Sequence, residues 1–237
     1  MRGFTDVHHH LVYGLDDGAK TFEQAMTMAA AADAAGTATL IATPHVLPGI
    51  RPFDEALYHR RVERLQAACR KRGMGLRLLE GAEILYTEQT CRMLREGRIP
   101  TLGGSGWVLV EFLPQTGYRD LCDALAGILR TGYRPVIAHV ERYRCLDAAG
   151  RRLRELRRAF GAVAQMNCST VLGGKGWLQD WRSRRWLDEG FVDLVATDAH
   201  NVTSRPTRMR EAYALLEARY GQAYARRLTG LDNPRSP

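Results

Sequence analysis

The sequence has no long apolar run and no paired cysteines. No stretch of its 237 residues approaches the roughly 18 to 20 consecutive apolar residues that a helix needs to cross a bilayer. The N-terminus also lacks the apolar segment of a secretory signal. We therefore expect a cytoplasmic protein without membrane insertion. The five cysteines are scattered, odd in number and without a CxxC pair, which argues against a disulfide framework and against a thiolate zinc site.

Lysine is nearly absent, since Lys20, Lys71 and Lys175 are the only lysines and the net charge of +8 comes mainly from arginine. Basic charge favours anionic partners such as phosphorylated peptides or nucleic acid, although a solvated surface is the commoner explanation. The densest basic run, at 151–158, has an apolar stripe that predicts a helix with a buried face and a wet arginine face. It has no interleaved aromatic residues for base stacking, so we do not expect it to bind nucleic acid.

Short apolar runs alternate with helical patterns along the chain. Helix signals such as the capping box of Thr21 and Gln24 lie between these runs. The pattern predicts an α/β fold with a parallel sheet, built as a (β/α)7 barrel. We expect one domain over 1–230 and a disordered tail over 231–237. The predicted strands are 4–8, 39–42, 76–79, 107–111, 135–139, 162–166 and 192–196.

Histidines and carboxylates follow most of these strands. Because side chains alternate along a strand, His8 and His10 lie on one face and His9 on the other. An isolated pair of this kind is also compatible with a tag remnant or a hydrogen-bonded core cluster. In a βα barrel, however, the carboxyl ends of all strands share one rim. Imidazole and carboxylate ligands without thiolate suit Mn, Fe or Zn. The polar residues on this rim are His8, His10, His45, Glu83, Glu111, His139, Asp198 and His200.

The motifs around these residues resemble a known superfamily. They include Gly-Leu-Asp-Asp-Gly at 14–18, Ala-Thr-Pro-His at 42–45 and Ala-His-Val-Glu-Arg-Tyr at 138–143. Together they are similar to the PHP (polymerase and histidinol phosphatase) superfamily, in particular to its CpsB/YwqE branch of manganese-dependent bacterial tyrosine phosphatases. The resemblance runs from Thr5 to about Arg205. Val140 stands where the family usually has proline, a departure that removes no ligand.

The resemblance implies a distorted (β/α)7 barrel of the PHP type, with a trinuclear metal site at the C-terminal rim of the strands. Mn²⁺ is the expected metal, with Fe or Zn as alternatives. Three divalent cations against four carboxylates leave two positive charges, which a phosphomonoester dianion neutralises. The implied ligands are His8, His10, Glu83 and Asp198 for the first ion, Glu83, Glu111 and His139 for the second, and Asp17, His45 and His200 for the third.

The resemblance further implies hydrolysis of phosphotyrosine on a cognate tyrosine kinase of polysaccharide export, in capsule or exopolysaccharide control. It also implies in-line attack on phosphorus by a metal-bridging hydroxide, with Arg142 and Arg205 binding the phosphoryl oxygens. A salt bridge within its own loop is the alternative for Arg142. Two other functions stay open: a phosphoesterase for small substrates such as histidinol phosphate, and a non-catalytic, metal-containing nucleic-acid-binding adaptor. The oligomeric state is open.

Three further features carry weaker signals. Cys145 and Arg151 have the C-x5-R spacing of cysteine-dependent tyrosine phosphatases, but Asp147 would place negative charge inside the phosphate cradle. The glycine-rich segment 173–176 lacks the first half of a phosphate loop and is expected only to turn the chain. The Trp177 and Trp181 side chains, four residues apart on a predicted helix, either pack or, if exposed, contact a substrate peptide or a neighbouring subunit.

The two catalytic hypotheses predict different effects of replacing Cys145 by serine. If metals supply the chemistry, C145S retains the hydrolysis of a phosphotyrosine peptide. If the thiolate is the nucleophile, the substitution removes the attacking atom. We expect retention, measured as the initial rate on a phosphotyrosine peptide at saturating metal. Loss of turnover in a folded C145S protein would move the chemistry to the cysteine motif.

Overall fold

Strands and helices alternate along residues 3–230, the part of the chain that the computed structural model describes. The predicted tail at 231–237 lies outside the described residues, and the single domain over 1–230 stays a prediction. The strands are β1 (Phe4–His9), β2 (Thr37–Ala42), β3 (His45–Val46), β4 (Arg77–Glu80), β5 (Glu83–Leu85), β6 (Trp107–Glu111), β7 (Arg134–Ile137), β8 (Val163–Asn167) and β9 (Leu194–Ala196). The helices are α1 (Phe22–Ala35), α2 (Glu55–Lys71), α3 (Thr90–Arg95), α4 (Tyr118–Leu129), α5 (Arg151–Phe160), α6 (Cys168–Val171), α7 (Trp177–Asp188), α8 (Met209–Tyr220) and α9 (Gln222–Leu228), with 3-10 turns η1 (Leu102–Gly104) and η2 (Val140–Arg142).

The pairings between these strands are all parallel, and their order is β1-β2-β4 in one sheet and β3-β5-β6-β7-β8-β9 in the other. In two places, a short strand follows a predicted strand after a break of two residues and continues it. Thr43 and Pro44 separate β2 from β3, and Gly81 and Ala82 separate β4 from β5. Counted this way, the strands occupy the seven predicted positions. The α/β class with a parallel sheet is confirmed.

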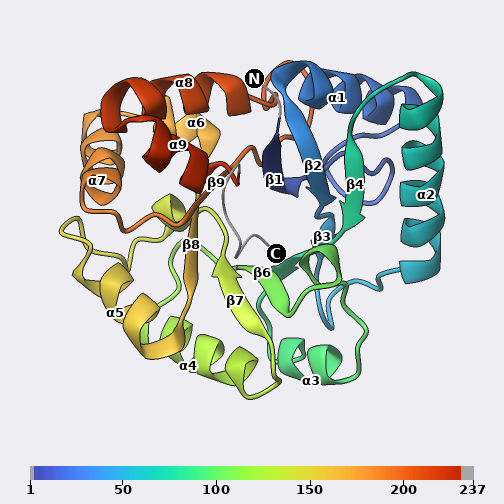
Figure 1. The fold of residues 1–237 in the computed structure, drawn as a ribbon. Coiled ribbons are helices and arrows are strands. Elements are labelled where there is room, and N and C mark those ends of the chain that lie inside the picture. The colour runs from blue at the N-terminus through green and yellow to red at the C-terminus, as the bar shows by residue number, and fades with distance from the viewer. Residues whose placement is uncertain (1–2, 231–237) are drawn as a thin grey trace.

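The first and last strands also meet. The Asp198 amide donates to the His8 carbonyl at 2.9 Å, and the His10 amide donates to the Ala199 carbonyl at 2.9 Å. His9 and Ala199 form an isolated parallel bridge. In Figure 1 the strands accordingly lie around the middle of the molecule and the helices lie outside them. No helix within residues 3–230 is long and apolar enough to span a membrane.

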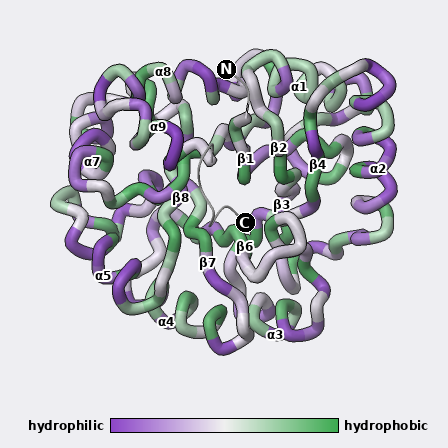
Figure 2. The backbone as a smooth tube through the Cα atoms, viewed as in Figure 1, coloured by the Kyte–Doolittle hydropathy of each residue, from purple (hydrophilic) through white to green (hydrophobic). Residues whose placement is uncertain are grey.

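Alternate strand residues face different parts of the core. Leu109 of β6 belongs to an inner cluster with Val7 and Ile41, whereas its neighbours Val108 and Val110 pack in the large cluster that includes the helices. This alternation follows from the two-residue period of a strand. Figure 2 shows the hydrophobic residues gathered on the strands and hydrophilic residues on outer helices such as α5 and α7. The helix predicted at the basic run is confirmed, with Leu153 and Leu156 buried.

One buried hydroxyl ties the two strand breaks together. Tyr58 of α2 is fully buried, and its hydroxyl lies 2.7 Å from the Ala42 carbonyl, which accepts. The same hydroxyl accepts from the Gly81 amide at 3.0 Å. These backbone groups lie where β2 and β4 end. Tyr58 therefore positions the segments that lead to His45 and Glu83.

Replacing Tyr58 by phenylalanine is expected to lower the free energy of unfolding by about 1–3 kcal/mol, because buried backbone groups lose their partner. Urea unfolding followed by circular dichroism measures the change. Tyr133→Phe is the matched control, since the Tyr133 hydroxyl makes no hydrogen bond within residues 3–230. Equal stability of the Tyr58→Phe and control variants would contradict this role.

Candidate metal centre

All nine predicted metal ligands lie together: His45 and Glu83 begin β3 and β5 after the strand breaks, and the others lie near or beyond the carboxyl ends of β1, β6, β7 and β9. Their ligand atoms form three groups in which the atoms lie within 4.8 Å of one another. The His139 Nε2 atom joins them at 2.7 Å from Glu83 Oε1 and 3.5 Å from Glu111 Oε2. The role of these residues as ligands stays a prediction, whereas their convergence is a fact of the fold. The three groups are His8, His10, Glu83 and Asp198; His10, Asp17, His45 and His200; and His45, Glu83 and Glu111.

The three groups of ligand atoms share more residues than the ligand sets that the resemblance implies. His10 lies in the group of Asp17 as well as in that of His8. The His45 Nδ1 atom lies 3.1 Å from Glu83 Oε2 and 3.3 Å from Glu111 Oε1, although His45 is implied to bind only the third ion. Two imidazoles therefore stand between groups that the resemblance treats as separate. The geometry describes one continuous cluster.

Hydrogen bonds fix which ring nitrogens of the first two histidines carry protons. Gln165 Oε1 accepts from the His139 amide at 2.8 Å, so it also accepts from His8 Nδ1, which lies at 3.1 Å. The His10 Nδ1 atom lies 2.8 Å from Asp16 Oδ2 and donates to it. A metal ligand must be a neutral imidazole, and with Nδ1 protonated in a neutral ring the lone pair lies on Nε2.

Those two lone pairs face each other. The Nε2 atoms of His8 and His10 lie 3.2 Å apart, and Glu83 Oε2 lies 3.1 Å from the first and 3.2 Å from the second. Glu83 Oε2 is also buried and has no hydrogen-bond partner within the described residues. Such a set of acceptors repels itself unless a proton or a cation lies among them. The residues present therefore fit a bound metal ion.

The electrostatics of the cluster favour positive charge. Burial opposes ionisation of Glu83, but His8, His10 and His139 hold the pKa of its carboxyl well below the ordinary value. Burial likewise opposes ionisation of Asp198, and His8 and His10 keep its pKa well below the usual range. In return, although burial lowers the pKa of His139, the carboxylates of Glu111 and Glu83 raise it to about 9. These ionised carboxylates are the charges that divalent cations would neutralise.

Two site residues adopt a backbone conformation that side chains rarely occupy. His139 has φ of 32° and Asp198 has φ of 52°, and they are the non-glycine residues with positive φ within residues 3–230. Strained backbone of this kind concentrates at functional sites. It also corrects the predicted strand 135–139, because β7 ends at Ile137, before His139 turns into the left-handed region.

Asp16 is a positioning residue that the sequence reasoning missed. Its Oδ2 atom accepts from His10 Nδ1 at 2.8 Å and from the His45 amide at 3.0 Å, and its Oδ1 atom accepts from the Gly18 amide at 2.9 Å. Burial opposes its ionisation, but His10 lowers the pKa of Asp16 to about 2. Only glycine fits at position 18, because a Cβ atom there would lie 2.1 Å from the His10 carbonyl oxygen. The sequence does contain a signal for this role. Metal-binding histidines usually donate their second N–H to a carboxylate, and Asp16 is a carboxylate directly beside the predicted ligand Asp17.

Gln165 and Asn167, like Asp16, hold predicted metal ligands in place through hydrogen bonds. Asn167 Nδ2 donates to Asp198 Oδ2 at 2.8 Å, and Gln165 Nε2 donates to Asn167 Oδ1 at 2.9 Å. Both side chains project from β8, two residues apart and therefore on the same face. They connect His8 to Asp198 and hold both in one orientation.

The two predicted phosphate-binding arginines meet at the mouth of the cluster. Arg142 Nη2 lies 2.5 Å from Asp198 Oδ2, and Arg205 Nη2 lies 2.9 Å from Asp198 Oδ1. Arg142 therefore pairs across the site with Asp198, and not within its own loop. Both side chains are partly exposed and line a cavity of about 410 Å³ together with Lys175 and Arg208. The cluster thus opens onto a basic cavity.

The rival phosphate motifs form no anion cradle. The amides of Arg151 and Arg152 donate to the carboxylate of Asp147, and burial raises the pKa of the Cys145 thiol. Both features oppose a reactive thiolate there.

The backbone amides of the glycine-rich segment 173–176 are likewise bound by a side chain of the protein itself. The amides of Gly174 and Lys175 donate to the Asp180 carboxylate, as expected for a segment that only turns the chain. The tryptophans that follow are exposed, with 81% of Trp177 and 46% of Trp181 accessible, so the packing alternative is wrong for them.

Comparison with known proteins assigns the family. The family model described as capsular polysaccharide synthesis, CpsB/CapC, matches residues 4–236. This chain belongs to the CpsB/CapC family. A relative within it, the tyrosine-protein phosphatase CpsB of Streptococcus pneumoniae, is 34% identical over 97% of this chain and 96% of its own. The tyrosine-protein phosphatase YwqE of Bacillus subtilis is 30% identical over 94% of this chain and 88% of its own.

A solved structure agrees with this CpsB/CapC assignment. It belongs to a study of YwqE from Bacillus subtilis and CpsB from Streptococcus pneumoniae, described as unique metal-dependent tyrosine phosphatases. It superposes with a TM-score of 0.87 at 29% identity and covers 95% of this chain and 91% of its own. The α/β fold with parallel sheets is therefore shared with this solved structure over the described part of the CpsB/CapC chain, residues 3–230.

Replacing Asp16 by asparagine is expected to weaken Mn²⁺ binding by about 10- to 100-fold, because an amide cannot accept all three hydrogen bonds, from His10, His45 and Gly18, that the carboxylate accepts. Competition with a metal-binding dye measures the affinity. Asp123→Asn, which alters an exposed carboxylate of α4, is the control. Equal affinity in the two variants would remove Asp16 from the site.

Proposed function

We propose that this chain is a metal-dependent phosphatase that hydrolyses phosphotyrosine on proteins. The observation that carries the proposal is the buried cluster of histidines and carboxylates that opens onto two arginines, Arg142 and Arg205, held together by Asp198. Membership of a family whose relatives are named tyrosine-protein phosphatases supports the same conclusion.

We infer three Mn²⁺ ions per chain, held by His8, His10, Asp17, His45, Glu83, Glu111, His139, Asp198 and His200. Fe and Zn suit the same imidazole and carboxylate donors. Divalent cations bound here would lower the pKa of coordinated water from 15.7 towards ~7 and would offset the charge of the phosphoryl group.

The arginines bind and orient the phosphoryl group. Guanidinium donates two parallel hydrogen bonds to phosphate oxygens, so Arg142 and Arg205 can hold the substrate at the mouth while the buried histidines stay fixed. Asn167 donates to Asp198 Oδ2, the oxygen that Arg142 also contacts, and keeps that carboxylate in place when the arginines turn to substrate. A tyrosinate leaving group has a pKa near ~10, so it needs less proton donation than an alkoxide.

The open rim suits a tyrosine on a protein. We propose the phosphorylated tail of a tyrosine kinase of polysaccharide export as substrate, in capsule or exopolysaccharide control. Lys175 lines the same cavity as Arg142, and the exposed Trp177 follows two residues later. Exposed aromatic side chains beside a basic cavity offer apolar contacts for residues that flank the phosphotyrosine.

Metal removal and one substitution test the proposal. Chelation, or His45→Ala, is expected to abolish turnover of a phosphotyrosine peptide, because His45 contacts Glu83, Glu111 and Asp17 at once. His59→Ala is the matched control, since His59 is an exposed histidine of α2 that pairs with Glu63 and Glu80, away from the cluster. Phosphate release from metal-loaded protein gives kcat and KM.

The substrate class is tested side by side. We expect a higher kcat/KM for a phosphotyrosine peptide than for histidinol phosphate on the same metal-loaded protein. A strong preference for histidinol phosphate would make the chain a small-molecule phosphoesterase. No turnover of either substrate after Mn²⁺ reconstitution would contradict catalysis altogether.

A further inference from the structure

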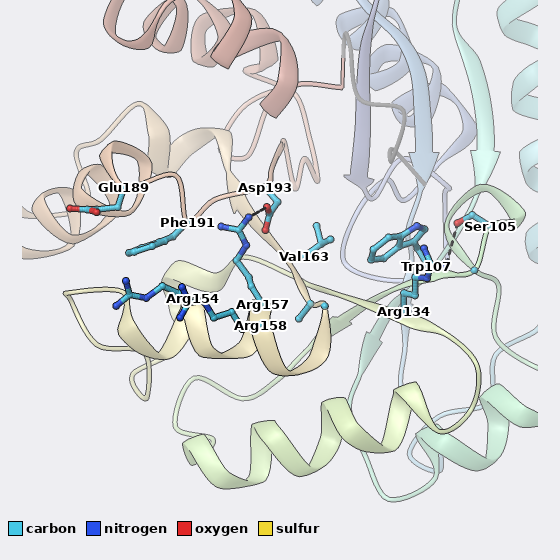
Figure 3. Close-up of a pocket in the computed structure, with 13 residues that line it drawn as sticks. Ser105, Trp107, Arg134, Arg154, Arg157, Arg158, Val163, Glu189, Phe191 and Asp193 are labelled. Atoms are coloured by element: carbon cyan, nitrogen blue, oxygen red, sulfur yellow. Dashed lines mark hydrogen bonds and ion pairs between the residues drawn. The ribbon is translucent and has the colours of Figure 1, made fainter.

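The opposite end of the strands carries a second basic cavity, with a volume of about 910 Å³. Trp107 and Arg134, the first residues of β6 and β7, line one side, and helix α5 lines another (Figure 3). Glu111 of the metal centre ends the same strand β6, so about 13 Å of strand separates the two sites. We name this site the arginine cavity, after its residues Arg134, Arg154, Arg157 and Arg158.

One of the four arginines that line the arginine cavity is paired with a carboxylate of residues 3–230. Arg157 Nη2 lies 2.8 Å from Asp193 Oδ1, and its other terminal nitrogen donates to the Gly190 carbonyl at 2.8 Å. The other three arginines of the cavity make no ion pair with any residue in the range 3–230. The carboxylate of Glu189, also in the lining, points away from Arg157 in Figure 3. Three guanidinium groups are thus left to bind an anion.

Aromatic rings hold two of these guanidinium groups in place. The Arg134 guanidinium carbon lies 5.5 Å from the centroid of the Trp107 ring, and that of Arg154 lies 5.8 Å from the Phe191 ring. A ring face attracts a cation without neutralising it, so the N–H donors stay available. Arg158 follows Arg154 by four residues and therefore lies on the same face of α5. The donors are arranged before a ligand arrives.

We propose that the arginine cavity binds a nucleoside polyphosphate. Guanidinium recognises phosphate through paired hydrogen bonds, and a polyphosphate carries enough charge to engage several arginines at once. Trp107, Ala162 and Val163 supply apolar lining for a planar base. The volume lies within the range of small-molecule sites, and a concave shape suits a small ligand better than a flat membrane surface.

Calorimetric titration of the full chain with the non-hydrolysable ATP analogue AMP-PNP, without added metal, tests this site. The unmodified protein is expected to bind saturably, and Arg154→Ala/Arg158→Ala is expected to bind at least about tenfold more weakly. Arg60→Ala/Arg70→Ala, on exposed positions of α2, is the control with the same change of charge and is expected to bind normally. Thermal unfolding of each variant shows that it is folded.

A substitution in the metal centre separates the two phosphate sites. Arg142→Ala/Arg205→Ala, which removes the anion-binding groups at the mouth of that centre, is expected to bind the analogue at the arginine cavity as the unmodified protein does, and loss of binding there would assign the ligand to the metal centre. Absence of saturable binding, or an unchanged affinity in Arg154→Ala/Arg158→Ala, would overturn the proposal. Inorganic triphosphate that binds as tightly as the analogue would overturn the nucleoside assignment. Binding of single-stranded DNA in place of the analogue would transfer the site to nucleic acid.

Discussion

The buried carboxylate of Glu83 is the charge around which the candidate metal centre is built. An ionised carboxylate buried in a protein is unfavourable unless opposite charge lies beside it. Four imidazoles surround this one, from His8, His10, His45 and His139. Parallel strands deliver these residues from four separate segments of the chain to one rim. A cation among them turns mutual repulsion of lone pairs into coordination, which links the fold directly to metal chemistry.

Several local features exist to keep that convergence in place. The breaks between β2 and β3 and between β4 and β5 bring His45 and Glu83 onto the rim, and the Tyr58 hydroxyl satisfies the backbone that the breaks expose. Positive φ at His139 and Asp198 shows strained backbone held by its surroundings. The rest of the fold stabilises geometry that an isolated segment would not keep.

The two ends of the same strands have different electrostatic character. At the carboxyl ends, arginines pair with Asp198 and face a cluster that attracts cations. At the amino ends, arginines lie against aromatic rings and face an open cavity. The arginines of this chain therefore lie in two structural sites as well as on the solvated surface. Arg157, paired with Asp193, shows that part of it also joins α5 to the segment before β9.

Local patterns along the chain were enough to predict the seven strand positions, the buried stripe of α5 and the gathering of histidines and carboxylates at one rim. These follow from residue periodicity and from the shared direction of parallel strands, which act over short sequence distances. The partner of each side chain required the folded chain. That His10 belongs to two groups, that Asp16 orients it and that Arg134 faces α5 depend on contacts between distant segments and on side-chain rotamers, which no local pattern encodes.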